Sequence, residues 1–235
     1  MTDTYLTTLS RDVAIIGAVP RDRLGAEVPS CPGWSMTDLL EHLGRVHRWV
    51  LAALASGPDD PMPSFPPRLD SSIDVADWFA EGAAELVGAL SSVDLESVRP
   101  TFVGPRPAQW WLRRQVFENA VHRWDAQTAL GPAPDPIELA ADGIDEWVML
   151  RTSRSWSPGA GIAGSIHLHG TDGEGEWLFE FADESFAVSH GHHKGDAAVR
   201  GSLSDLCLLV WGRVSPDQLE VLGDGELVAR FLAAT

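Results

Sequence analysis

Cysteine is scarce in this chain, which has only Cys31 and Cys207 among its 235 residues. Two cysteines so far apart do not make a disulfide framework, and they fit a reducing compartment better. The first residues, MTDTYLTTLSRD, lack the basic region and apolar run of a secretory signal. No apolar stretch approaches the roughly 20 residues that are needed to cross a bilayer. We therefore expect a soluble, cytoplasmic protein.

Positive charge is also in short supply. The sequence has 17 basic residues against 34 acidic ones, which gives a net charge of -17. Such a surface repels phosphate backbones and anionic lipids, so we expect neither nucleic acid nor a membrane as a partner. The hydrophobic fraction of 44% is that of an ordinary globular protein. At this length the chain is able to form one large domain or two small ones, each with a buried core.

The first half of the chain has the apolar spacing of amphipathic helices. This spacing predicts helices over 4–19, 36–55, 74–90 and 108–130. The second of them starts at Ser35, with Asp38 three residues later, in the pattern of a capping box. Two proline-containing connections, at 57–70 and near 100–107, separate the last three helices. Residues 1–135 are therefore predicted to form a four-helix bundle.

The pattern changes after the segment GPAPDP at 131–136. We expect a helix over 137–152, and then short strands in SIHLHG, in EWLFEFA and near 186–190, with a TDGEG turn between the first two. The segment DAAVRGSLSDLCLLVWGR reads as a strand that leads into an apolar helix, and GDGELVARFLA as a last amphipathic helix. Residues 136–235 are thus predicted to be a small α+β domain with an antiparallel sheet, which makes the whole chain a two-domain α+β protein.

A candidate metal site lies on the fourth predicted helix. Glu118 and His122 are four residues apart, so their side chains lie one turn apart on the same face. A third ligand has to come from another helix, and His42 and His47 border the apolar stripe of the second helix on opposite sides. Periodicity does not choose between them. A nitrogen and oxygen ligand set suits zinc, and also manganese, nickel or iron. Three protein ligands would leave one position open, as in catalytic zinc sites.

Other residues have competing interpretations. Asp125 and Arg114 share the face of Glu118, where they either orient the ligands or form a surface ion pair. His167 and His169 point to the same side of one predicted strand, which we interpret as a polar sheet face. Three more histidines occur in SHGHHKG, which we interpret as a solvated loop.

Two further residues are chemically suggestive. Cys31 has the thiol of a nucleophile, but its Pro-Gly setting favours a turn residue packed at the entry of a helix. Arg213, in WGR, has the charge to anchor an anionic substrate, but we interpret it as an ordinary surface arginine.

These motifs resemble a known family. The segment VPSCPGWSMTDLLEHLGRVHRW, followed some 70 residues later by FENAVHRWDAQTALG, is similar to the mycothiol-dependent maleylpyruvate isomerase family of actinobacteria. The segments AVRGSLSDLCLLVWGR and LGDGELVARFL resemble the C-terminal domain of that family, which is related to sterol-carrier-like domains. The resemblance implies a DinB-like bundle whose metal ligands are His42, Glu118 and His122, so it selects His42 over His47.

The resemblance also implies a chemistry. The family uses mycothiol, a small thiol, as a cosubstrate, and a divalent metal, most often zinc, favours its thiolate form. A thiolate that adds to an activated double bond and then leaves gives cis-trans isomerisation, and one that displaces a leaving group gives an S-transferase. The expected partners are mycothiol and a small electrophile. The alternative is a non-catalytic module that binds metal, or an apolar ligand in its C-terminal domain.

Overall fold

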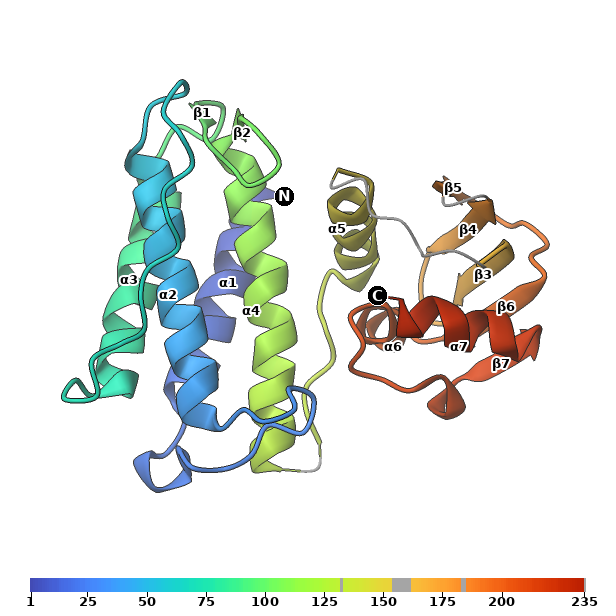
Figure 1. Cartoon of the computed structure of the whole chain (residues 1–235), viewed down its shortest axis with the longest axis horizontal. Coiled ribbons are helices and arrows are strands. Elements are labelled where there is room, and N and C mark those ends of the chain that lie inside the picture. Colours follow the sequence, from blue (N-terminus) through green and yellow to red (C-terminus); the bar gives the residue numbers. More distant parts are fainter. Residues whose placement is uncertain (132, 154–161, 183–184, 235) are drawn as a thin grey trace. The chain divides into compact units, whose positions relative to one another are not determined.

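The computed structural model describes residues 1–131, 133–153, 162–182 and 185–234. The chain divides into two compact units, Met1–Asp135 and Pro136–Thr235 (Figure 1). Each unit has its own core of buried hydrophobic side chains.

The first unit is built from four helices, which lie side by side in Figure 1. They are α1 (Thr2–Gly17), α2 (Met36–Ala55), α3 (Val75–Ser92) and α4 (Ala108–Leu130). The connection from α2 to α3 returns along the length of the bundle, so these two helices run in the same direction (Figure 1). Short elements fill the other connections: the 3-10 turn Arg21–Arg23, and the two-residue strands β1 (Val98–Arg99) and β2 (Arg106–Pro107).

Local signals in the sequence set where the helices begin. The Ser35 side chain accepts a hydrogen bond from the amide of Asp38, and the Asp38 side chain accepts one from the amide of Ser35, which completes a capping box at α2. At α3 the carboxylate of Asp74 accepts from the amides of Ala76 and Asp77. Each cap fixes the residue at which its helix begins. For α2, this also fixes the direction in which each of its side chains points.

Helix α4 is the most deeply placed element of the bundle. It carries buried residues on most of its circumference, with buried polar side chains among them. One of these is Arg123, which pairs with Asp12 of α1 at 3.2 Å, and neither side chain is exposed to solvent. A charge pair at this depth is costly to break, and Asp12 has a second cationic partner in Arg11, at 2.8 Å. The pair therefore anchors α4 against α1.

The second unit consists of a five-stranded sheet and three helices. The strands are β3 (Gly164–Gly170), β4 (Glu176–Ala182), β5 (Ser185–His190), β6 (Ala197–Gly201) and β7 (Glu220–Gly223), in the order β5-β4-β3-β6-β7. The helices are α5 (Ala140–Ser153), α6 (Leu203–Val210) and α7 (Gly225–Ala233), with a 3-10 turn at Pro216–Gln218. The β3–β6 pair is parallel and the other three pairs are antiparallel.

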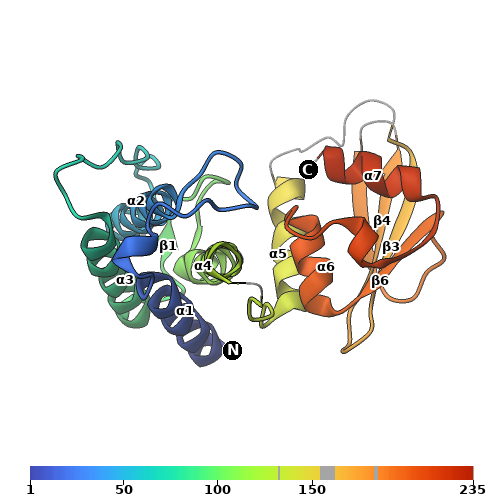
Figure 2. The same cartoon turned by 90° about the horizontal axis from the view of Figure 1, so that it is seen from below.

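The three helices cover one face of the sheet (Figure 2). Trp147 of α5 stacks on Phe179 of β4 with ring centroids 5.9 Å apart, and Phe231 of α7 contacts the same phenylalanine at 5.7 Å. Because side chains alternate along a strand, the neighbours of Phe179 in β4 point to the opposite face. That second face carries His167 and His169 of β3, which pair with Leu178 and Glu176 of β4.

The two-domain α+β fold predicted from the sequence is confirmed. The four helices of the bundle lie within two residues of their predicted bounds. The β1–β2 pair and strand β7 were not predicted, because they are only two and four residues long. The parallel β3–β6 pair is likewise invisible to patterns within single strands. None of the helices in the described part of the chain has the length and apolar character that a membrane span requires.

Candidate metal centre

The three predicted ligands meet between α2 and α4. The His42 Nε2 atom donates a hydrogen bond to Glu118 Oε1 at 3.2 Å, and His122 Nε2 lies 3.7 Å from the same oxygen. One donor atom from each side chain lies within 4.8 Å of the other two. In a tetrahedral zinc site with bonds of about 2.0 Å the ligand atoms are about 3.3 Å apart. The donor types and their spacing therefore fit a divalent ion. We refer to these three residues as the helical cluster.

Histidine 47 takes a different role on the same helix. It is fully buried, its Nε2 lies 3.0 Å from Asn119 Oδ1, and its ring packs 5.4 Å from that of Phe79. Burial lowers the pKa of His47 to about 4, so the ring is neutral at physiological pH. His47 is thus a residue of the bundle core, whereas His42 faces Glu118.

Asp125 orients His122. Its Oδ2 atom lies 2.8 Å from His122 Nδ1, and the side chain is not exposed. Its other oxygen accepts a hydrogen bond from the Ser30 hydroxyl at 2.5 Å, and the Cys31 thiol donates to Oδ2 at 3.6 Å. With Nδ1–H directed at a carboxylate, the lone pair of His122 lies on Nε2, towards Glu118. This is the arrangement in which a carboxylate fixes the tautomer of a metal-binding histidine.

The thiol of Cys31 also belongs to this region. Cys31, His122 and Asp125 form a second group whose donor atoms lie within 4.8 Å of one another. The hydrogen bonds to Asp125 account for this proximity, because they bring the loop that contains Ser30 and Cys31 against α4. The turn-residue interpretation of Cys31 missed this contact with the site.

Arg114 fixes the carboxylate of Glu118. The two side chains form an ion pair one turn apart on α4, and the Arg114 side chain is only 9% exposed. Burial by itself would raise the pKa of Glu118, but the charge of Arg114 and the hydrogen bond from His42 outweigh it and hold the pKa well below its ordinary value. Glu118 is therefore ionised. Arg114 contacts Oε2, which leaves Oε1 directed at the two histidines.

Trp34 forms one wall of the cluster. Its ring centroid lies 5.0 Å from that of His42 and 6.2 Å from that of His122, nearly parallel to the latter. The loop that holds Trp34 leads directly into the cap of α2. The side chain of His42 keeps 29% of its surface exposed, whereas that of His122 keeps 10%. The cluster is thus accessible from the side of His42. Trp34 was not singled out from the sequence, although it lies in the VPSCPGW segment.

The remaining candidates lie in the second unit. The Arg213 guanidinium is partly buried and donates to the carbonyl of Trp211 at 2.7 Å. His167 and His169 do share one face of β3, as predicted, but they also gather two further side chains around them.

Comparison with known proteins places the chain in a family. Residues 9–127 match the family model described as the mycothiol maleylpyruvate isomerase N-terminal domain, and residues 138–230 match the one described as the MDMPI C-terminal domain. The chain belongs to this family. The two matches include every residue of the helical cluster and nearly all of the second unit.

Solved structures show the same fold. The crystal structure of the mycothiol-dependent maleylpyruvate isomerase aligns with a TM-score of 0.65 at 16% identity, over 94% of this chain and 92% of that one. A histidine-to-alanine mutant of that enzyme aligns with a TM-score of 0.63 at 17% identity, with the same coverage. No curated protein is a significant match to the sequence. At these identities the likeness to the solved structures establishes the shared two-domain fold.

Proposed function

We propose that this protein is a metal- and mycothiol-dependent enzyme that either isomerises a small electrophile or transfers the thiol to it. His42, Glu118 and His122 are its metal ligands, and zinc is the ion that best suits them. The observation that carries the proposal is the meeting of two imidazole nitrogens and an ionised carboxylate beside an accessible edge. Family membership supports the choice of thiol, because a structural neighbour is named as a mycothiol-dependent enzyme.

The metal, when bound, supplies a Lewis-acidic position that stabilises the thiolate form of a thiol at neutral pH. The residues of the chain prepare that position. Asp125 holds the Nδ1 proton of His122, and Arg114 holds one oxygen of Glu118, so that two of the three ligands are oriented in advance. With three protein ligands, a fourth position stays open for the cosubstrate.

Trp34 and Arg114 shape the surroundings of that position. The indole of Trp34 lies against both imidazoles and gives the cluster an apolar wall. The charge of Arg114 offsets that of Glu118, so the cluster as a whole repels an incoming anion less strongly than a bare carboxylate would. Both features suit a thiolate and an anionic electrophile.

Metal analysis tests the ligand assignment. Protein that is purified without a histidine tag should carry an ion in the helical cluster, so His42→Ala should lower the metal content by one equivalent relative to the wild type. The control is His47→Gln, which changes a histidine five residues further along the same helix whose side chain lies in the core. If the two variants lost metal equally, or if the His42 variant kept it, the assignment would be wrong.

Thiol chemistry tests the reaction. Maleate-like and chlorinated electrophiles should be converted only when mycothiol and metal are both present. Isomerisation leaves the concentration of free thiol unchanged, whereas S-transfer consumes one thiol per product, so a thiol titration separates the two reactions. A protein that binds metal but converts no electrophile with any thiol would favour the non-catalytic alternative.

A further inference from the structure

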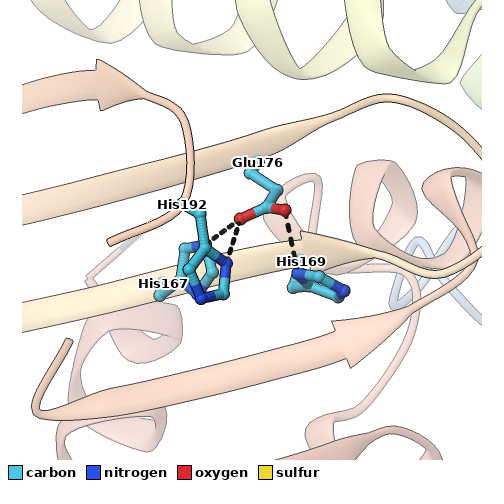
Figure 3. Close-up of side chains that lie close together, drawn as sticks. All are labelled: His167, His169, Glu176 and His192. Carbon is cyan, nitrogen blue, oxygen red and sulfur yellow. Dashed lines mark hydrogen bonds and ion pairs between the residues drawn. The ribbon is translucent and has the colours of Figure 1, made fainter. Parts of the chain in front are cut away.

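Four side chains converge on the face of the sheet that the helices leave uncovered: His167, His169, Glu176 and His192 (Figure 3). We call them the strand cluster. Glu176 lies at the centre. Its Oε2 atom is 2.9 Å from His167 Nε2 and 2.8 Å from His192 Nδ1, and its Oε1 atom is 3.3 Å from His169 Nδ1. The three imidazole rings also contact one another, with centroids 5.3 to 6.1 Å apart.

The sheet register brings these residues together. His169 and Glu176 are direct partners in the antiparallel β3–β4 pair, where opposite side chains lie on the same face. His167 lies two residues before His169, and so points to the same side. The cluster is thus built into the sheet, and the interpretation of the two histidines as an ordinary polar face was incomplete.

A turn supplies the fourth member. Gly191 follows β5 with a φ of 107°, a backbone conformation that favours glycine, and its amide donates to the carbonyl of Glu176 at 3.1 Å. This turn brings His192 to the side chain of Glu176, where its Nδ1 atom contacts the carboxylate. By contrast, His190 faces Asp145 at 3.5 Å, and His193 lies 3.4 Å from the carbonyl of His190. The SHGHHKG segment is an exposed loop, as the sequence predicted, but His192 also contacts Glu176, which that interpretation did not include.

The spacing of the donor atoms suits a metal ion. The separations from the imidazole nitrogens to the carboxylate, 2.8 to 3.3 Å, are close to the edge of about 3.3 Å in a tetrahedral zinc site. One donor atom from each of the four residues lies within 4.8 Å of all the others. The His167 side chain is only 6% exposed, so the inner wall of the group is shielded from water. Arg200, which lies opposite His169 in the β3–β6 pair, is paired with Glu220 at 2.9 Å.

We propose that the strand cluster is a second metal site, which binds a zinc-like divalent cation through three imidazoles and one carboxylate. Four protein ligands complete a tetrahedron, which is the pattern of a structural site. Bound there, the ion ties β3 and β4 to the turn after β5. Its function is therefore to stabilise the second unit, and it is independent of the chemistry proposed for the helical cluster.

The experiment uses the full chain, without a tag, and with the helical cluster disabled by His42→Ala and His122→Ala. The metal-free protein is titrated with zinc, and separately with cobalt, whose visible absorption reports tetrahedral coordination. We expect one equivalent to bind and the melting temperature to rise with zinc. Absence of binding in this background would overturn the proposal, whatever the activity of the unmodified enzyme proves to be.

Variants within the cluster locate the site. Added to the same background, Glu176→Gln and His192→Ala should each weaken zinc binding at least about 100-fold, because loss of even an outer partner of a metal ligand commonly costs 10- to 100-fold. His192 is 79% exposed, so its replacement leaves the fold intact. The matched control is His193→Ala, which should change the affinity less than about twofold. Equal affinity in the His192 and His193 variants would contradict the proposal.

Discussion

The two units each contain a cluster of histidines around one glutamate, but the clusters are built in different ways. In the helical cluster, two ligands come from one helix and the third from another, and buried partners orient them. In the strand cluster, the glutamate of β4 lies among three imidazoles, two from β3 and one from the turn after β5. Three donors leave a position for a thiol, whereas four complete the coordination. This difference supports the catalytic role that we propose for the first cluster and the structural role that we propose for the second.

Glutamate-to-glutamine substitution should abolish most of the turnover in the helical cluster and leave turnover nearly unchanged in the strand cluster. Glu118→Gln removes the ionised carboxylate between His42 and His122 and leaves Arg114 without its partner at Oε2. We expect thiol-dependent turnover to fall at least about 1,000-fold, since the metal and the open position are lost together. Glu176→Gln should leave turnover within about twofold of wild type. Steady-state rates of the two variants, measured with added zinc, decide this, and a large loss in the Glu176 variant would make the strand cluster catalytic.

The pH dependence of stability distinguishes His47, which lies in the core, from the histidines of the helical cluster. Burial lowers its folded pKa to about 4, compared with about 6.5 in the unfolded chain. As the pH falls, His47 is therefore protonated near pH 6.5 in the unfolded chain, but only near pH 4 in the folded protein. The stability that depends on neutral His47 is present above pH 6.5 and is lost as the pH falls towards 4, by about 3 kcal/mol in total.

Urea unfolding of metal-free protein between pH 7 and pH 4 measures this loss. The control is His47→Gln, which keeps an amide for Asn119 but does not titrate over this range. Its free energy of unfolding should fall less steeply with acid than that of the wild type. Parallel pH profiles for the two proteins would show that His47 is not a buried, neutral group.

A substitution of Asp125 tests whether a residue that hydrogen-bonds to a metal ligand affects metal binding in the helical cluster. Asp125→Asn keeps the shape of the side chain but removes the charge that holds the Nδ1 proton of His122. We expect zinc affinity at this cluster to fall by about 10- to 100-fold, the usual cost of losing such a partner. Competition with a chelator of known affinity gives the number. An unchanged affinity would mean that Asp125 serves packing alone.

We expect the smallest effect on stability and zinc affinity from a substitution of Gly191. Gly191→Ala places a Cβ at a φ of 107°, which strains the turn and should cost about 1 kcal/mol of stability. If the turn positions His192, zinc affinity of the strand cluster should drop several-fold while that of the helical cluster stays constant. A drop in both affinities would point to a general loss of folding instead.

The sequence predicted the helical cluster better than the strand cluster, for a physical reason. Within a helix, spacing fixes which side chains share a face, so Glu118 and His122 were paired from the sequence alone. The choice of His42 over His47 needed the family resemblance, because both border the same apolar stripe. In a sheet, by contrast, partners depend on register. Nothing within β3 indicates that His169 opposes Glu176, and only the turn at Gly191 brings His192 to them.

The fold, too, was predicted best where the signal lies within a single segment of the chain. Long periodic segments such as α2 were predicted with their bounds, and so was the capping box at Ser35. The two-residue strands β1 and β2 and the parallel β3–β6 pair depend on contacts between distant segments. The roles of Trp34 and Cys31 also depend on tertiary packing, because their loop meets α4 only in the folded bundle.

The most direct test of the account is anomalous scattering at the zinc absorption edge from crystals of the full chain grown with zinc. We predict a peak within bonding distance of His42 Nε2, Glu118 Oε1 and His122 Nε2, with room beside it for a sulfur ligand. A helical cluster without a peak, in crystals that contain zinc elsewhere, would contradict it.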